Sequence, residues 1–540
     1  MKKKIFALLL AVLMLVPFIV ACGDTSSDTN TQSDTNTQTT DTSTSSGNET
    51  TDTSKPTDTS TDKPTVEKVD TKTDKSQKWS GQTLDCIAGG WGGDAYGQAG
   101  AWSQPELYVK GFYQDGSLGQ TVNNGVWARQ TQVEKIYGVT MVWHQAKSNT
   151  TMQNELQTGL EAGAAKYHIA TPRAYETQAL IAAETVYDLA NSKYIDLTKS
   201  YYNQAAVDSF SIYGHTFFVA GDFSYLDEYT SFVIFYNQAI SEKFQTFGNL
   251  YNTVRNGRWT LSELSKKGAL VGADDDGTPG YQDTDTYGFG TTGMAGFFQA
   301  SGINQVSVDK SSNDPSQYKY HITLNDPNVS DLVTQLVNIR SSNWARTSWD
   351  GGYGAMLQSF TGGKLLFYEE VVQKIFEFPT QSETFKVAVL PLPMQNTDQE
   401  SYYTPFASQA TVMCIPKASL DREMSEYFFD VLSWTGQDYV MSAFYEAMES
   451  RLYDDGETSR EDALEMLTDY VLSSLTYDQG YMHEAMGMKF LSFVQSETIS
   501  GATASSSPFQ TLYSEAFPDA NKMLNDEKTG WNTNAKNYKD

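Results

Sequence analysis

The sequence contains few cysteines, few histidines and few basic residues, and each shortage argues against a class of function. Its 540 residues include only 3 cysteines and 5 histidines, and no two histidines form the H-E-x-x-H pair of a zinc protease. Lysine and arginine together number 38 against 66 acidic residues, which gives a net charge of −28. Nucleic-acid binding requires basic patches that displace counterions, so this charge balance argues against a nucleic-acid partner.

Sequence signatures of common enzymes are also missing. The chain has neither a G-x-S-x-G elbow nor a G-x-x-x-x-G-K-[ST] phosphate loop. One G-x-G-x-x-G match, at residues 288–293, follows the polar run 283–286. A dinucleotide-binding fingerprint requires an apolar strand at that point, so we interpret the match as a turn. The sequence therefore predicts neither a catalytic residue nor a cofactor.

The one long apolar run lies at the N-terminus. Residues 5–20 are apolar and follow three consecutive lysines, Lys2 to Lys4. A membrane span needs about 20 apolar residues, so this shorter run is typical of a secretory signal. The sequence Ile19-Val20-Ala21-Cys22 resembles a bacterial lipobox, which is cut before the cysteine that then carries the lipid. We predict a signal peptide over 1–21, lipidation of Cys22 and attachment to the extracellular face of the cell membrane. An ordinary signal peptide and an uncleaved anchor helix are the alternatives.

A polar stretch follows the cysteine. Residues 22–78 consist mainly of Thr, Ser, Asp, Asn and Gln, with almost no large apolar side chain. Such a segment cannot bury enough apolar surface to offset the entropy of ordering, so we expect a disordered tether. A flexible linker of this length has a root-mean-square reach of about 40 Å.

The chain from Trp79 onward is long enough for two or three domains. Residues 84–88, 232–236 and 364–368 predict short apolar strands, whereas 421–478 has a helical pattern throughout. Strand-like segments alternate with helix-like segments, which is typical of an α/β chain.

With Cys22 assigned to the lipid, two cysteines remain. Cys86 and Cys414 each lie in an apolar, strand-like context. We expect two buried thiols, because free cysteine is among the most buried residue types. A disulfide between them is the alternative, which an exported compartment would permit.

The segment Asn256-Gly257-Arg258-Trp259-Thr260-Leu261-Ser262-Glu263-Leu264 matches the pattern G-[KR]-W-T-x-x-x-L. It is the third of five blocks that, in order, resemble the extracellular solute-binding proteins of Gram-positive carbohydrate ABC importers. The resemblance is clear over residues 190–520 and looser over 80–190. The other blocks are 194–198 with 201–203, 211–214 and 220–222; 235–237; 360–367 with 390–393 and 402–404; and 444–446 with 464–467 and 477–478.

This resemblance implies an α/β fold of the two-lobed periplasmic-binding-protein type (class II), with hinge strands and a helical C-terminal region. The first lobe would comprise 79–224 and about 391–450, and the second 225–390 and 451–540. Hinge closure would bury a solute between the lobes. The implied function is capture of a carbohydrate, most simply an oligosaccharide, and its delivery to the permease of an ABC importer. The chain shows no heptad or repeat, and we predict a monomer.

Two other functions stay open. A tethered glycoside hydrolase would use a carboxylate pair such as Glu369 with Asp222. Adjacent Glu369 and Glu370 cannot form that pair from one strand, because neighbouring side chains point to opposite faces. The third possibility is a solute-binding protein that serves a sensor kinase.

Candidate solute-binding residues are aromatic and acidic side chains that follow the ends of predicted strands or precede a turn. Aromatic rings stack on the C–H faces of sugars, and carboxylates accept hydrogen bonds from sugar hydroxyls. The candidates are Trp91, Tyr175, Asp222, Tyr225, Trp344, Trp349, Tyr353, Tyr368 and Glu369.

An acidic loop is the remaining candidate site. Asp274, Asp276 and Asp283 take the third, fifth and twelfth positions of a Ca²⁺ loop if Gly277 is its central glycine. The first position of the loop is then Gly272, which has no side-chain oxygen to bind the ion. We expect a solvated surface turn, with a weak Ca²⁺ site as the alternative.

Overall fold

We analysed a computed structural model of the chain. It describes residues 67–89, 119–146, 149–244, 247–278, 282–291, 293–294, 296–323, 327–347, 352–408, 410–453, 459–482 and 531–539. All of them belong to the compact unit Pro64–Asp540, which is distinct from Met1–Lys63. The predicted signal peptide, Cys22, Trp91 and Trp349 lie outside the described residues. Within the described ranges, no helix combines the length and the apolar character that a membrane crossing requires.

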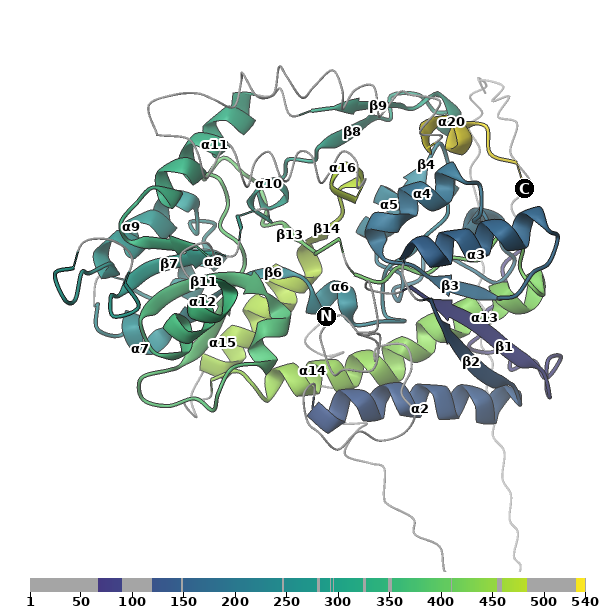
Figure 1. The fold of residues 1–540 in the computed structure, drawn as a ribbon, viewed down its shortest axis with the longest axis horizontal. Coiled ribbons are helices and arrows are strands. Elements are labelled where there is room, and N and C mark those ends of the chain that lie inside the picture. Colours follow the sequence, from purple (N-terminus) through teal and green to yellow (C-terminus); the bar gives the residue numbers. More distant parts are fainter. Residues whose placement is uncertain are drawn as a thin grey trace, which may run out of the picture. The chain divides into compact units, whose positions relative to one another are not determined.

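The first lobe is built on a parallel sheet with the strand order β2-β1-β3 (Figure 1). Its strands are β1 (Thr83–Ala88), β2 (Thr140–Gln145) and β3 (Ile169–Thr171), connected through helices α2 (Gly119–Tyr137) and α3 (Asn149–Glu161). Parallel neighbours need such helical crossovers. Antiparallel bridges from Ala170 to Cys414 and from Met413 to Val219 extend the sheet. Helix α13 (Arg422–Thr435) contributes Phe428 and its neighbours to the core of this lobe.

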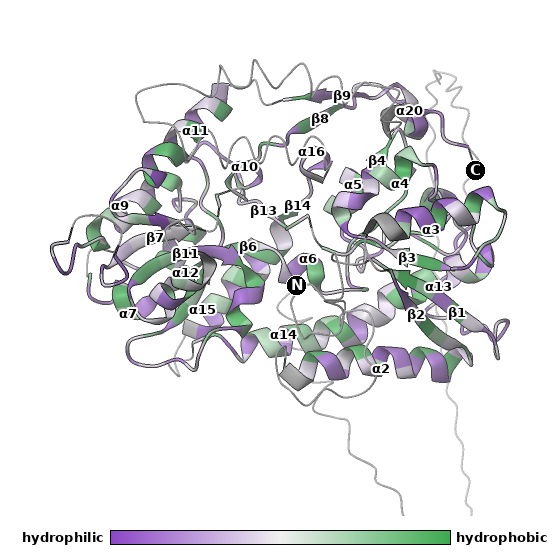
Figure 2. Ribbon diagram, viewed as in Figure 1, coloured by the Kyte–Doolittle hydropathy of each residue, from purple (hydrophilic) through white to green (hydrophobic). Residues whose placement is uncertain are grey.

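The second lobe is built on a five-stranded mixed sheet, with the strand order β10-β7-β11-β6-β12. Strands β10, β7 and β11 are parallel, and β6 is antiparallel to both of its neighbours. All seven residues of β11 are buried, as expected for a strand with both faces covered. Figure 2 shows that both hydrophobic and hydrophilic residues occur along the strands of this sheet. The bounds are β6 (Phe232–Asn237), β7 (Tyr287–Thr291), β10 (Ala345–Thr347), β11 (Leu365–Val371), β12 (Val387–Leu390), α9 (Leu261–Val271), α11 (Pro327–Arg340) and α12 (Gly352–Thr361).

Shorter elements complete the described chain. Two of them, η6 and η7, are π-helical turns, which frequently occur at functional sites. The others are short helices, 3₁₀ turns and two-stranded ribbons. Their bounds are η1 (Ala174–Glu176), α4 (Thr177–Ala182), η2 (Leu189–Asn191), α5 (Gln204–Phe210), β4 (Ser211–Ile212), β5 (His215–Thr216), α6 (Leu226–Tyr229), α7 (Gln238–Ser241), α8 (Leu250–Arg255), α10 (Gly296–Ala300), β8 (Val306–Asp309), η4 (Pro315–Gln317), β9 (Lys319–Ile322), η5 (Val372–Phe376), β13 (Thr404–Pro405), η6 (Gly436–Met441), α14 (Ser442–Glu449), α15 (Ser459–Glu465), η7 (Met466–Val471), η8 (Leu472–Ser474), β14 (Leu475–Thr476), α16 (Gln479–Met482) and α20 (Trp531–Lys536).

The chain passes between the lobes several times. The outgoing strand β6 and the returning segment before Ala407 lie side by side, with a bridge between Ser231 and Phe406. A nearly continuous helix, α13-η6-α14, also runs from the first lobe to the second, where Arg451 accepts a hydrogen bond from Gln381. Residues 475–482 lead back, because β14 pairs with β13 and Tyr477 bonds to Ser209 of α5. These contacts agree with the predicted two-lobed α/β fold.

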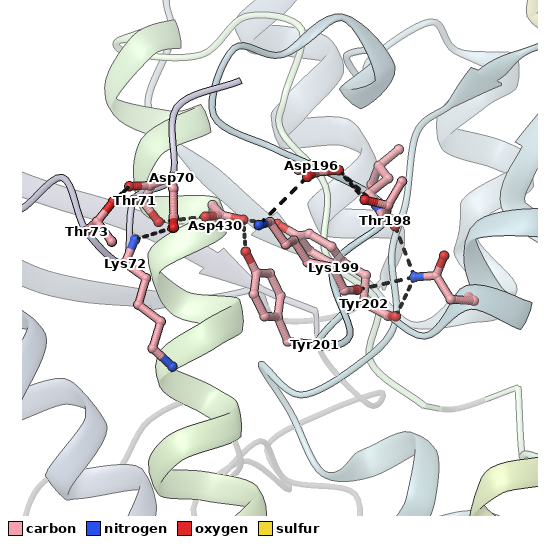
Figure 3. A network of polar contacts seen from close by, with 12 residues as sticks. Asp70, Thr71, Lys72, Thr73, Asp196, Thr198, Lys199, Tyr201, Tyr202 and Asp430 are labelled. Carbon is pink, nitrogen blue, oxygen red and sulfur yellow. Dashed lines mark hydrogen bonds and ion pairs between the residues drawn. The ribbon is translucent and has the colours of Figure 1, made fainter. Parts of the chain in front are cut away.

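Residues 67–78 belong to the first lobe rather than to the tether. The Val69 N–H donates to Lys193 O at 3.0 Å, and Thr71 is fully buried. Thr71 Oγ1 donates to Asp430 Oδ2 at 2.6 Å (Figure 3). The first lobe therefore includes the described residues from Glu67 onward, which corrects the predicted start of the folded part at Trp79. Residues 67–78 are polar because their side chains and backbone form hydrogen bonds with the lobe. A disordered linker is polar as well, so composition alone did not distinguish the two. We call residues 67–78 the N-terminal strap.

The C-terminal helix also differs from its predicted position. The resemblance predicts that residues 451–540 belong to the second lobe. In agreement with this, Arg255 of that lobe forms ion pairs with Asp462 and Glu465. Helix α20, however, packs on α4 of the first lobe. There Tyr538 OH donates to Val186 O at 3.0 Å. The predicted partition therefore does not hold for α20.

The two remaining cysteines are buried and unpaired, as expected. Cys86 lies in β1, and Cys414 lies in the strand that extends the same sheet. Both have no exposed surface, and burial raises the pKa of both thiols. The alternative of a disulfide is excluded in this structure.

Candidate functional site

The carboxyl edges of both sheets adjoin the segments that connect the lobes. In the first lobe, the bridge between Arg173 and Thr411 lies just beyond the carboxyl end of β3. In the second lobe, Val371 at the carboxyl end of β11 pairs with Phe232 at the start of β6. Residues 222–232 and 404–411 therefore join the two edges. Ligands of open α/β sheets bind at the carboxyl ends of strands, so this joint is the candidate site.

Polar groups of η1 form the part of the site in the first lobe. Arg173 is fully buried, and its Nη1 donates to Thr411 Oγ1 at 2.9 Å. Its backbone N–H donates to Glu176 Oε2 at 2.7 Å. Predicted Tyr175 lies between these residues in the sequence, is half-buried, and donates its backbone N–H to Ser408 O at 3.1 Å. The structure thus places Tyr175 at the carboxyl edge, where it is partly exposed.

In the second lobe, the candidate site is centred on Glu369. Glu369 Oε2 accepts a hydrogen bond from Thr291 Oγ1 at 2.5 Å, and Thr291 is the last residue of β7. The backbone N–H groups of Gly293 and Met294 donate to the same threonine oxygen. Glu369 is fully buried, so it stabilises this edge from inside the lobe.

Two predicted aromatic residues of the second lobe lie elsewhere. Tyr368 is fully buried, with its ring 5.4 Å from that of Phe360, because its side chain points to the opposite face of β11 from Glu369. Trp344 precedes β10, so it lies at the amino edge of the sheet, where its ring packs on Gly268. Neither residue faces the joint. Tyr353 lies in α12, at a position whose side chain is not described.

Three carboxyls, which we call the acid cluster, lie at the joint: Asp222, Asp227 and Glu228. Asp222 is half-buried, and its Oδ2 accepts a hydrogen bond from Gln437 Nε2 at 2.7 Å. Asp227 and Glu228 are buried in α6, and Asp227 Oδ2 accepts a bond from Tyr477 OH at 3.1 Å. The cluster thus joins α6, η6 and the 475–482 segment, which belong to three different connections between the lobes.

Burial dominates the electrostatics of the acid cluster. Burial, together with the charge of Asp227, raises the pKa of Asp222 to about 7. Burial also raises the pKa of Asp227, and burial with the neighbouring Asp227 carboxyl raises that of Glu228. Ionisation of both neighbouring carboxyls at once is disfavoured, because buried like charges repel each other.

Sequence reasoning proposed Asp222 but did not propose the residues that surround it. Gln437 lies in the π turn η6, which begins at Gly436, and a glycine inside a helical pattern indicates a packing or functional constraint. Asp227 and Glu228 stand next to each other between aromatic residues, which was the available signal. Tyr225 is buried and its ring stacks on Phe444 at 5.1 Å, so it packs inside the joint.

The raised pKa of Asp222 predicts a pH-dependent stability. Between about pH 4 and pH 7 the folded chain holds a proton that the unfolded chain has lost. The contribution of this carboxyl to stability is therefore complete below pH 4 and is lost as the pH rises through 7. We expect Asp222→Asn to reduce the fall in the free energy of unfolding between pH 5 and pH 8 by about 1–2 kcal/mol, after allowance for solvent screening.

Urea unfolding of the two proteins at both pH values measures this difference. Asp208→Asn removes an exposed aspartate of α5 and is the matched control. Its pH dependence should follow that of the parent protein. A fall in stability that is identical in the parent and in Asp222→Asn would contradict the prediction.

The acidic loop differs in one residue from the prediction. Ligand oxygens of Asp274, Asp276 and Asp285 lie within 4.8 Å of one another, whereas Asp283 Oδ1 accepts a bond from Arg346 Nη2 at 2.6 Å. Asp285 therefore replaces Asp283 in this group. Asp276 accepts hydrogen bonds from the Thr278 N–H and from Thr284 Oγ1 through its two oxygens. Both bonds are formed within the loop itself, which agrees with the expected surface turn.

Comparison with solved structures identifies the fold. No protein-family model matches the sequence, and a search of curated protein sequences gave no significant match. Among solved structures, a cyclo/maltodextrin-binding protein in complex with maltotetraose is similar, with a TM-score of 0.52 and 13% identity over 82% of this chain and 97% of that one. The sugar-binding protein MalE of Xanthomonas citri is similar with the same TM-score and identity, over 82% of this chain and 98% of that one. The chain therefore has the two-lobed α/β fold of the maltodextrin-binding proteins.

Proposed function

We propose that this chain is an extracellular, lipid-anchored solute-binding protein that captures an oligosaccharide between its lobes and delivers it to an ABC importer. The main support is the joint itself, because the carboxyl edges of both sheets adjoin the segments that connect the lobes. Closure about those segments would surround a solute with groups from both lobes. The fold shared with maltodextrin-binding proteins and the lipobox sequence before Cys22 are consistent with this role.

Within the described residues, two predicted side chains suit direct contact with a sugar. Tyr175 and Asp222 both lie at the joint, and both side chains are partly exposed. A tyrosine ring can stack on a sugar face, and an aspartate can accept bonds from sugar hydroxyls. We propose these two as solute contacts, with Trp91, Trp349 and Tyr353 as further proposed contacts from the sequence.

The hydrolase alternative has less support. It needs two carboxyls on either side of a glycosidic bond, about 5–9.5 Å apart. Glu369 is fully buried and bonded to Thr291, so it offers no surface to a substrate. Asp222 is bonded to Gln437 and lies with two further acids. A binding protein needs no such carboxylate pair, and we favour binding without catalysis.

Titration with maltotetraose, followed by thermal unfolding and chromatography of the sugar, tests the proposal. We expect a rise in the melting temperature, since a ligand at a hundredfold excess over Kd stabilises by about 2.7 kcal/mol, and we expect intact sugar afterwards. Tyr175→Ala should weaken binding at least about tenfold, whereas Tyr453→Ala, near the amino end of β12, should not. Cleaved sugar would support a hydrolase, and no shift with any oligosaccharide would contradict the carbohydrate assignment.

Delivery to an importer requires a second experiment. Cells that lack this chain should take up labelled oligosaccharide more slowly, and the wild-type gene should restore uptake. A Cys22→Ser variant, which loses the proposed lipid attachment, should restore it poorly. Normal uptake without the chain would favour the alternative in which the protein serves a sensor kinase.

A further inference from the structure

A β-hairpin of the second lobe reaches the first lobe. Strands β8 and β9 lie between α10 and α11 in the sequence and pair in an antiparallel manner. Figure 1 shows them extending from the region of α10 toward β4 and α20. The hairpin includes η4, whose Pro315 is in contact with Gly214 of the β4–β5 turn. It therefore connects the lobes through a route separate from the crossing segments.

The contact at the tip of the hairpin is small and specific. The Tyr213 backbone N–H, in the first lobe, donates to Tyr320 OH of β9 at 3.1 Å. The two rings are 5.0 Å apart in an edge-on arrangement, and both residues are buried. Lys536 of α20 lies over the Tyr213 ring at 5.8 Å. A hydrogen bond and a ring pair of this kind each contribute about 0.5–1.5 kcal/mol, so they can break and re-form.

The base of the hairpin is held by a second group of bonds. Asp478 is buried, and its carboxylate accepts hydrogen bonds from the N–H groups of Gln305 at 2.7 Å and Val306 at 3.5 Å. The same segment is tied to α5 of the first lobe, where Ser209 Oγ donates to Tyr477 O at 2.7 Å. The hairpin thus has a base that is bonded to the 475–482 segment and a tip that contacts the β4–β5 turn.

The backbone of the β4–β5 turn is strained at the contact. Tyr213 has a φ of +52° and Gly214 a φ of +82°, as a type I′ turn requires. Glycine adopts this conformation readily, whereas a tyrosine there is unfavourable unless its side chain is stabilised by contacts. Contact with Tyr320 supplies such stabilisation. The strained tyrosine therefore indicates a role for the ring beyond forming the turn.

We propose that the β8–β9 hairpin is a latch that favours the closed arrangement of the lobes. This inference rests on the proposed function, since lobes that admit a solute must separate. When they rotate about the crossing segments, the contact of Tyr320 and Pro315 with Tyr213 and Gly214 has to break. The latch therefore sets the fraction of closed protein before any solute binds, and it slows release of a bound solute.

The distance between the lobes in the absence of solute tests the latch. Spin labels are attached in the full chain, carrying Cys22→Ser, at Ala179→Cys of α4 and Thr334→Cys of α11, two exposed positions. Cys86 and Cys414 are buried and should not react. We expect Tyr320→Ala to increase the population with a long distance about five- to tenfold, which corresponds to about 1–1.4 kcal/mol.

Two further variants serve as an independent test and as a control. Tyr213→Asn removes the ring but retains a residue that tolerates positive φ, so it should open the lobes while the turn stays intact. Lys319→Ala alters an exposed residue of β9 next to Tyr320 and should leave the distances unchanged. Identical distance distributions in the parent, Tyr320→Ala and Tyr213→Asn would overturn the latch, even if maltotetraose binds. Failure of maltotetraose to bind would count against the proposed function and leave this distance test intact.

Discussion

Removal of residues 1–78 is expected to destabilise the folded chain by about 3–5 kcal/mol relative to a chain that begins at Pro64. The shorter protein lacks the N-terminal strap, which supplies Thr71 to the buried carboxyl of Asp430. That carboxyl also accepts bonds from Tyr201 OH at 2.9 Å and Tyr202 OH at 2.7 Å (Figure 3). Loss of one of three donors leaves a buried acceptor partly unsatisfied, which is costly.

The strap satisfies further buried groups. Trp434 Nε1 donates to Thr71 Oγ1 at 3.1 Å, and the Ser76 N–H donates to Tyr427 OH at 3.0 Å. Tyr427 OH in turn donates to Asp74 O. Without the strap, these side chains of α13 lose their hydrogen-bond partners together. The predicted loss of stability is therefore larger than that of any one hydrogen bond.

Chemical unfolding of chains starting at Pro64 and at Trp79 measures the effect. Thr71→Ala in the longer chain should cost about 1–2 kcal/mol, because it removes one hydroxyl, which donates to Asp430 and accepts from Trp434, and leaves the rest of the strap in place. Thr73→Ala, at an exposed position of the same strap, should change stability by less than about 0.5 kcal/mol. Equal stability of the two chain lengths would show that the strap contributes nothing to the fold.

Gly436→Ala is expected to destabilise the chain by at least about 3 kcal/mol, a large effect for one methyl group. A Cβ at this position would lie 2.0 Å from the backbone oxygen of Asp222 and 2.7 Å from Phe223 Cα. Both atoms belong to the backbone of the segment that leads into α6, so neither can move aside alone. The substitution would push η6 away from the joint between the lobes.

A second helical glycine provides the matched control. Gly354 lies in α12, and a Cβ there would meet nothing within 4 Å. Alanine favours helices over glycine, so Gly354→Ala should stabilise by up to about 1 kcal/mol. Urea unfolding of both variants gives the comparison. If Gly436→Ala were as stable as the parent protein, η6 would not lie as close to the Asp222 backbone as the structure shows.

Much of the fold class could be predicted from local patterns. The apolar strand 84–88, the strands 232–236 and 364–368 and the helical stretch from 421 correspond to β1, β6, β11 and the run that begins with α13. Such runs are visible in sequence because strands buried on both faces have continuous apolar residues. The buried thiols of Cys86 and Cys414 follow from the same patterns.

The candidate site was less predictable. Tyr175 and Asp222, which sequence position selected, lie at the joint, and their contact with a solute stays a prediction. Sequence position did not indicate that Tyr368 and Glu369 are fully buried, because the direction of a side chain depends on the elements packed against its strand. For Trp344 the reasoning selected the wrong edge of the sheet, since the residue precedes β10 instead of following a strand.

The sequence by itself determined the α/β class, the two-lobed architecture and the absence of common enzyme motifs, because these depend on short-range periodicity and on a resemblance carried by ordered blocks. Only the tertiary structure decided where the folded part begins, which carboxyls gather at the joint and where the hairpin docks. Asp430 lies 359 residues from Thr71, and Tyr477 lies 250 residues from Asp227. Contacts between positions so far apart depend on the packing of both lobes, and no local pattern encodes them.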